Sequence, residues 1–222
     1  MSGNNNRTAK TIGVLFIIGT VAGVLSGVST GDILGKANLL AKVSTNENQI
    51  LLGTFFLLIM AISLALVPVF LYPIAKKYNE VLALGYVVFR GALETFTYLV
   101  TAISWLLLVV LSKEYERNVS ADSAGLQLIG NFISDSGEWV NSITMIIFSL
   151  GALMFYYLSY KFKLIPRWLS GWGVIAGILY LATGMFALFE TPFTILLLPL
   201  AIQEMVMAVW LIVKGFNASA NG

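Results

Sequence analysis

The chain has 222 residues, of which 58% are hydrophobic and only 11% are charged, and its formal net charge is +2. Soluble domains contain about 25% charged residues, so this composition, with a mean hydropathy of +0.87, places the chain among membrane proteins. The chain has no Cys and no His, which excludes disulfides, thiol nucleophiles, histidine general bases and zinc sites built on these ligands. The small net charge and the lack of a basic stretch predict no nucleic-acid partner.

Six apolar runs are long enough to cross a bilayer, which requires about 20 helical residues. We expect these spans at about residues 11–29, 49–72, 81–111, 138–160, 168–189 and 192–213. The short connections leave no room for a separate soluble domain, so residues 1–222 are expected to form a single membrane domain. The sequence therefore predicts an all-α, polytopic six-transmembrane-helix bundle that has the lipid bilayer as its main partner.

The first apolar run follows Arg7 and Lys10, as the core of a signal peptide would. The run is long, however, and no small-residue cleavage site follows it, so we expect an uncleaved first helix. Gly19, Gly23 and Gly27 lie four residues apart within this run. This spacing predicts a smooth helix face against which another helix packs closely.

Two segments between the spans are more polar. Residues 30–48 place Ile33, Ala37 and Leu40 on one helical face, which predicts a short interfacial helix. Residues 112–137 are rich in charged side chains, and we expect a polar loop there.

Prolines suggest where helices bend or begin. Pro68 should bend the second span, which we expect to end near Pro73. Thr191 followed by Pro192 is typical of a helix N-terminus, so the sixth span is expected to begin there. Pro199 would then lie inside that span and kink it.

The basic residues predict the orientation of the bundle. One side of the membrane would carry eight of them, and the other side would carry four. The larger group is Arg7, Lys10, Lys76, Lys77, Lys161, Lys163, Arg167 and Lys214; the smaller is Lys36, Lys42, Lys113 and Arg117. Because basic loops stay in the cytoplasm, both termini are expected there, in a multi-pass protein of the inner membrane.

Polar side chains follow one face of the third span at a mean period of 3.6 residues. These residues are Tyr86, Arg90, Glu94, Thr97, Thr101 and Ser104. A polar stripe on a membrane helix should face the bundle interior or a water-filled cavity. Glu94 lies about 13 residues into the span, so roughly 20 Å deep at 1.5 Å per residue, close to the middle of the bilayer.

Glu204, preceded by Gln203, lies near the middle of the sixth span and can meet the stripe at the same depth. Arg90 and Glu94 are four residues apart and can pair on one helix. With Glu204 the three charges sum to −1, so a proton, a cation or a ligand ammonium is expected to complete the cluster. We therefore take Arg90, Glu94, Glu204, Gln203, Tyr86 and Thr97 as the candidate ligand- or proton-binding residues.

A second polar group occurs before the fourth span. Asp135, Glu138 and Ser142 are three and four residues apart and share a helical face, with Asp122 and Asn131 nearby. These oxygens suit a hard cation, but carboxylates at a membrane boundary are ordinarily solvated and are favourable near a helix N-terminus. We therefore predict no metal site, no cofactor and no catalytic residue.

Several segments of the chain carry a family resemblance. They are NENQILLG at 46–53, LYPIAKKYNEVLALGYVVFRGALE at 71–94, LIPRWLSGWGVIAGILY at 164–180 and QEMVMAVWLIVKGFN at 203–217. With these as its clearest pieces, the sequence resembles, over nearly the whole chain, the bacterial membrane-protein family named domain of unknown function 4386. The resemblance implies a six-helix integral membrane protein whose motif charges are Arg90, Glu94 and Glu204, with Pro166 and Arg167 in a cytoplasmic loop. It implies no activity.

Three interpretations of the charged cluster remain open. In the leading one, the protein binds or transports a small molecule or couples to protons through Arg90, Glu94 and Glu204. In the second, the protein is a structural, sensor or accessory subunit in which the same charges only lock the bundle. In the third, it is an intramembrane enzyme acting on lipid through the two carboxylates. The sequence does not set the ligand, the direction of transport or the oligomeric state.

Overall fold

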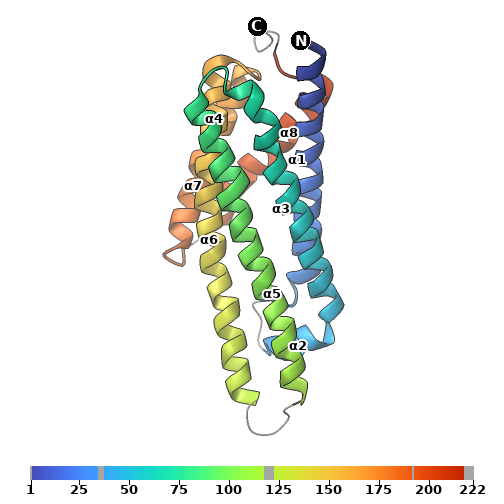
Figure 1. Ribbon diagram of the computed structural model, residues 1–222. Coiled ribbons are helices and arrows are strands. Elements are labelled where there is room, and N and C mark those ends of the chain that lie inside the picture. The colour runs from blue at the N-terminus through green and yellow to red at the C-terminus, as the bar shows by residue number, and fades with distance from the viewer. Residues whose placement is uncertain (1, 35–37, 118–122, 192, 218–222) are drawn as a thin grey trace.

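The computed structural model describes residues 2–34, 38–117, 123–191 and 193–217, which form an elongated bundle of helices (Figure 1). The helices in chain order are α1 (Ser2–Thr30), α2 (Leu39–Thr45), α3 (Glu47–Ala75), α4 (Glu80–Tyr86), the π-helix η1 (Val87–Leu93), α5 (Glu94–Arg117), α6 (Ser123–Phe162), α7 (Arg167–Ala187), the 3-10 helix η2 (Thr194–Leu197) and α8 (Leu198–Val213). The described residues contain no β-strand. The predicted all-α fold class is confirmed.

Six of these helical segments are long and apolar enough to cross a membrane. They are Asn5–Thr30, Glu47–Ala75, Glu80–Arg117, Ser123–Phe162, Arg167–Ala187 and Thr194–Val213. Large apolar side chains point outward from all six, with Val28, Val81 and Ile195 among the most exposed. In a bilayer such faces would meet lipid rather than water, so their exposure would carry no hydrophobic cost. The buried residues are mainly apolar, but they include the charged side chains of Arg90 and Glu94.

The third and fourth helical segments are longer than the sequence predicted. Residues 123–137, expected to be loop, are the first four turns of α6, and α5 continues to Arg117. Forty residues of α6 measure about 60 Å, twice the thickness of a hydrocarbon core, so this helix is longer than a bilayer span requires. The end of the pair distant from the termini reaches past the other long helices (Figure 1).

Packing against α2 explains why residues 123–137 are helical. Leu126, Gly130 and Ile133 recur at steps of four and three residues and form one face of α6. Leu126 and Ile133 pack on a buried cluster that includes Leu39 and Leu40 of α2, and Gly130 lies against Leu40. The short helix predicted within 30–48 is therefore present, but its apolar face is buried by protein, and Ala37 lies outside the described residues.

Small residues allow the close packing of α1 on its neighbours. Gly19 faces Leu64 of α3, and Gly23 faces Met60 on the same helix. Nothing lies within 4 Å of the position that a side chain on Gly27 would take. The predicted close packing is thus confirmed for two of the three glycines.

The sixth span begins differently from the prediction. The hydroxyl of Thr191 donates to the carbonyl of Phe186 at 3.2 Å, at the end of α7, and Pro192 lies outside the described residues. The chain then forms η2, and Pro199 stands in the first turn of α8, where its missing N–H costs no helical hydrogen bond. The apolar segment Thr194–Val213 agrees with the predicted span at about 192–213. The predicted helix N-terminus at Thr191 and Pro192 was wrong, because the N-cap is Phe193, and so was the kink inside the helix at Pro199. In α3, by contrast, the helix passes through both Pro68 and Pro73 to Ala75.

Both terminal segments lie at the same end of the bundle (Figure 1). The backbone N–H of Asn217 donates to the carbonyl of Leu164 at 2.9 Å, and its side-chain amide donates to Lys163 at 2.8 Å. The C-terminal segment is therefore joined to the loop between α6 and α7. In the loop after α3, Tyr78 packs on Phe162, the last residue of α6.

Candidate functional site

Arg90 lies in a π-helical segment within an otherwise α-helical span. The seven residues of η1 join α4 to α5 without a break, and Arg90 is 3% exposed. Helix α6 approaches η1 closely at Gly151, where an added Cβ would lie 3.2 Å from the backbone nitrogen of Arg90. Single π-turns inside α-helices occur frequently at functional sites.

Arg90 and Glu94 form a buried ion pair one turn apart. Nη1 of Arg90 donates to both carboxylate oxygens of Glu94, at 2.8 and 3.0 Å. Glu94 is 1% exposed, so this pair is shielded from solvent. Removing one partner from such a pair leaves an uncompensated charge in a low-dielectric interior.

Glu204 reaches the same arginine from α8. Its Oε1 lies 3.5 Å from Nη2 of Arg90, so the two guanidinium nitrogens face two different carboxylates. The structure thus brings together all three predicted intramembrane charges. Glu204 is 14% exposed, unlike the other two, and this contact with Arg90 is its only hydrogen-bonding or ionic contact within the described part of the chain.

Aromatic side chains surround the cluster. The hydroxyl of Tyr98 donates to Oε1 of Glu94 at 2.8 Å. The guanidinium of Arg90 lies over the ring of Phe148 at 4.4 Å, and Phe16 lies at 6.0 Å. A cation over an aromatic face is stabilised by the ring quadrupole, so these rings help to hold Arg90 in a dry environment.

Tyr86 and Thr97, also predicted as site residues, are buried beside the cluster. The ring of Tyr86 stacks on Phe155 of α6, with centroids 5.3 Å apart. The hydroxyl of Thr97 donates to the backbone carbonyl of Glu94 at 2.7 Å. Both residues therefore support the helix segment that carries the charges.

Gln203 ties α8 to two other helices. Its side-chain oxygen accepts a 2.6 Å hydrogen bond from the hydroxyl of Tyr156 on α6, and its amide nitrogen donates to the carbonyl of Leu169 on α7 at 3.0 Å. The side chain is fully buried, and both ends of its amide have protein partners. Gln203 thus fixes the position of the helix turn that presents Glu204.

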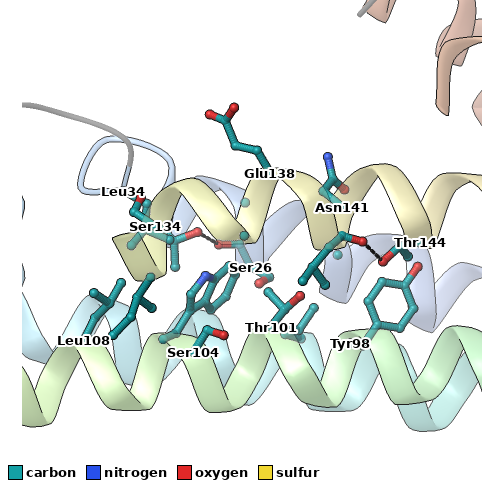
Figure 2. Close-up of a pocket in the computed structure, with 18 of the residues that line it drawn as sticks. Ser26, Leu34, Tyr98, Thr101, Ser104, Leu108, Ser134, Glu138, Asn141 and Thr144 are labelled. Atoms are coloured by element: carbon teal, nitrogen blue, oxygen red, sulfur yellow. Dashed lines mark hydrogen bonds between the residues drawn. The ribbon is translucent and has the colours of Figure 1, made fainter. Parts of the chain in front are cut away.

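Two neighbouring cavities lead to the cluster. A cavity of about 330 Å³ is lined by Arg90 and Glu204, together with Tyr180 of α7. A larger cavity of about 440 Å³ lies between α5, α6 and α1, where Thr101 and Ser104 of the predicted polar stripe line it (Figure 2). The two cavities have five lining residues in common, Gly23, Met60, Tyr98, Asn141 and Thr144, so they adjoin.

Tyr98, Asn141 and Thr144 were not among the residues that the sequence singled out. Tyr98 follows Glu94 by four residues, so the i, i+4 rule contained this signal. Asn141 and Thr144 are three residues apart on α6, but nothing in the sequence shows which side of that helix faces α5. Figure 2 shows Tyr98, Thr101 and Ser104 on the side of α5 that faces α6.

The outer polar group does not gather into a cation site in the described residues. Ser142 donates its hydroxyl to the backbone carbonyl of Glu138 at 3.0 Å. Glu138 is exposed and projects from α6 away from α5 (Figure 2). Three or more Asp or Glu side chains nowhere converge in the described part of the chain, and Asp122 lies outside it.

This fold is an all-α bundle with six helical segments long and apolar enough to cross a membrane, as in a multi-pass membrane protein, and three charged side chains meet inside its described part. The chain belongs to the family described as "Domain of unknown function (DUF4386)", whose model matches residues 11–215. The family suggested by the sequence motifs is therefore confirmed. Comparison with curated proteins and with solved structures found no significant match.

Proposed function

We propose that the protein binds a small molecule or a proton at the Arg90, Glu94 and Glu204 cluster and moves it across the membrane. The observation that carries this proposal is the position of Glu204, whose partly exposed carboxylate lines a cavity beside a buried ion pair. Ionisable side chains inside a membrane are costly and commonly mark substrate, ion or proton pathways.

The charge balance supports a ligand at this point. Arg90 compensates one carboxylate, and the shorter contacts assign that role to Glu94. Glu204 is left with a 3.5 Å contact and an open side, so a proton or a positively charged ligand would complete the cluster. A cavity of about 330 Å³ is within the range of small-molecule sites.

We further propose that the protein resides in the inner membrane of a bacterium, with both termini in the cytoplasm. The end of the bundle that holds the terminal segments also holds the loops with Lys76, Lys77, Lys163 and Arg167. Basic loops remain on the cytoplasmic side, which supports this orientation.

The proposal is tested by a screen for ligand-induced thermal stabilisation of the purified protein. A panel of cations, anions and neutral solutes would be compared at several pH values on wild type, Glu204→Gln and Glu116→Gln. Glu116 is an exposed glutamate on α5 distant from the cluster, so its variant controls for the loss of one carboxylate. Stabilisation by a solute or a proton that is lost only in Glu204→Gln supports the proposal, and the absence of any Glu204-dependent response contradicts it.

The geometry of Arg90 and Glu94 favours one alternative, in which the cluster only locks the bundle. The pair is dry, doubly hydrogen-bonded and covered by Phe148. The stability of the unliganded Glu204→Gln variant separates the two functions. A large loss of stability favours the lock, whereas equal or greater stability than wild type indicates a carboxylate held at a cost, as functional groups often are.

A further inference from the structure

Five hydroxyl groups around the larger cavity direct their protons to the backbone. Thr101 donates to the carbonyl of Thr97 at 3.2 Å, Ser104 to Val100 at 2.9 Å and Thr144 to Val140 at 2.7 Å. On α1, Ser26 donates to Gly53 at 2.8 Å and Thr30 to Ser26 at 3.0 Å. The bond made by Thr144 is drawn in Figure 2.

A hydroxyl has one proton and two acceptor lone pairs. Once the proton is given to a backbone carbonyl, only lone pairs remain for a molecule in the cavity. The same holds for Tyr98, which lines both cavities and donates its proton to Glu94 at 2.8 Å. Six hydroxyl groups on α1, α5 and α6 therefore offer acceptors to an occupant.

The charged residues along the two cavities also favour an occupant that donates hydrogen bonds and carries a positive charge. Glu138 is the only charged residue in the lining of the larger cavity, and it stands at the exposed edge. In the smaller cavity, Arg90 is the only basic lining residue, and it faces the carboxylates of both Glu94 and Glu204. The remaining donors in the two linings, on Thr20, Trp105, Ser134, Asn141 and Tyr180, are uncharged.

The linings of the two cavities run from one end of the bundle to Glu204. The larger one is lined by Leu34, Leu108 and Ile133, which belong to the cluster that packs around α2. This cluster lies at the end of the bundle opposite the termini (Figure 1). From there the lining continues through Thr144 and Tyr98, which border both cavities, to Glu204.

We propose that the ligand is a small cation with N–H donors, such as a primary ammonium, and that it reaches Glu204 from the end of the bundle opposite the termini. Its positive group exchanges hydrogen bonds to water for hydrogen bonds to the hydroxyl oxygens of Thr101, Ser104 and Thr144. It finally pairs with the carboxylate of Glu204. Apolar side chains of the smaller cavity, including Met60 and Phe148, accommodate a short hydrocarbon chain. This inference rests on the proposed function and names the chemical class of its ligand.

Three probes of matched length and shape test the inference. Butylammonium, 1-butanol and butanoate differ mainly in the charge of one end group. Each is added at pH 7 and equal ionic strength to purified wild type and to Glu204→Gln, and the thermal unfolding temperature is followed against concentration. The difference between the two proteins removes effects of the probes on the detergent or on the bilayer.

A Glu204-dependent stabilisation by butylammonium alone is the expected result. Thr101→Val and Thr144→Val preserve side-chain shape and remove one acceptor each, so each should weaken the apparent affinity about threefold or more. Thr54→Val is the matched control, because Thr54 makes the same hydroxyl-to-backbone bond, to Ile50 at 2.8 Å, but lines neither cavity. The affinity of this control variant should equal that of wild type.

Several results would overturn the inference. They are an equal response to the three probes, a lack of response to butylammonium, and equal weakening in Thr54→Val and Thr144→Val. A preference for butanoate that disappears in Glu204→Gln would also overturn the cation class, but it would leave the binding site in place. The proposed function itself fails only if no solute and no proton in the wider panel produces a Glu204-dependent response.

Discussion

The hydroxyl of Tyr98 donates a 2.8 Å hydrogen bond to Oε1 of Glu94, the same oxygen that accepts from Nη1 of Arg90. Tyr98 also lines both cavities. One side chain therefore connects the dry ion pair to the space that leads to Glu204. A change in the cavity that moves Tyr98 therefore changes the hydrogen bond that the Glu94 carboxylate accepts.

Replacing Tyr98 with Phe should destabilise the protein by about 1–2 kcal/mol, because a hydrogen bond to a charged acceptor is lost and one carboxylate oxygen keeps only Arg90 as a partner. The ring remains, so the apolar packing is preserved. Denaturant unfolding in detergent measures this change. Tyr157→Phe, at an exposed tyrosine on α6, is the control and should change stability little. Equal effects of the two substitutions would show that the bond to Glu94 contributes nothing.

Replacing Arg90 with Leu should destabilise the protein by about 3–5 kcal/mol, because two carboxylates would then lie in the interior without a positive charge. Equilibrium unfolding of wild type, Arg90→Leu, Glu94→Gln and the double variant measures the coupling of the pair. The double variant should lose less stability than the sum of the two single variants. Strict additivity would mean that the buried contact between Arg90 and Glu94 does not stabilise the fold.

Much of this arrangement is encoded in local sequence pattern. Apolar runs predicted the six membrane-crossing helices, and the 3.6-residue spacing placed Arg90, Glu94 and Ser104 on one face. The same rule applied to Tyr98 would have added it to the site. Such patterns succeed because a lipid-exposed polar stripe is too costly, so the stripe must face inward.

Other features depend on contacts between distant segments and left no local signal. The first turns of α6 are helical because Ile133 packs on the cluster that includes Leu40 of α2 and Gly130 lies against Leu40 itself, more than 80 residues earlier in the chain. The π-turn at Arg90 lies where Gly151 of α6 allows a close approach. The sequence shows that residues 130 and 151 are glycine and residue 40 is leucine, but it does not show which helices these residues bring into contact.

Gln203 should act on stability through Tyr156. Gln203→Leu removes the acceptor of a buried hydroxyl, which costs about 1–3 kcal/mol when the hydroxyl is left unpaired. Tyr156→Phe in the same chain removes that hydroxyl, so the double variant should recover part of the loss. Unfolding of the two single variants and the double variant provides the coupling energy. If the stability loss of the double variant equals the sum of the losses of the two single variants, the bond between Gln203 and Tyr156 is not the source of the effect.

Gly151 and Gly137 offer two alanine substitutions of opposite sign on one helix. A Cβ at position 151 would lie 3.2 Å from the nitrogen of Arg90 and from Cβ of Phe89, closer than ordinary packing, whereas nothing lies within 4 Å of a Cβ at position 137. Gly151→Ala should therefore destabilise the protein by about 1–3 kcal/mol through overpacking against η1. Gly137→Ala should stabilise it by about 0.5–1 kcal/mol, because alanine restricts the unfolded chain and favours the helix. Thermal unfolding of the two variants in one detergent makes the comparison. Stabilisation by both substitutions would mean that α6 and η1 separate easily, and the π-turn would then owe nothing to their close contact.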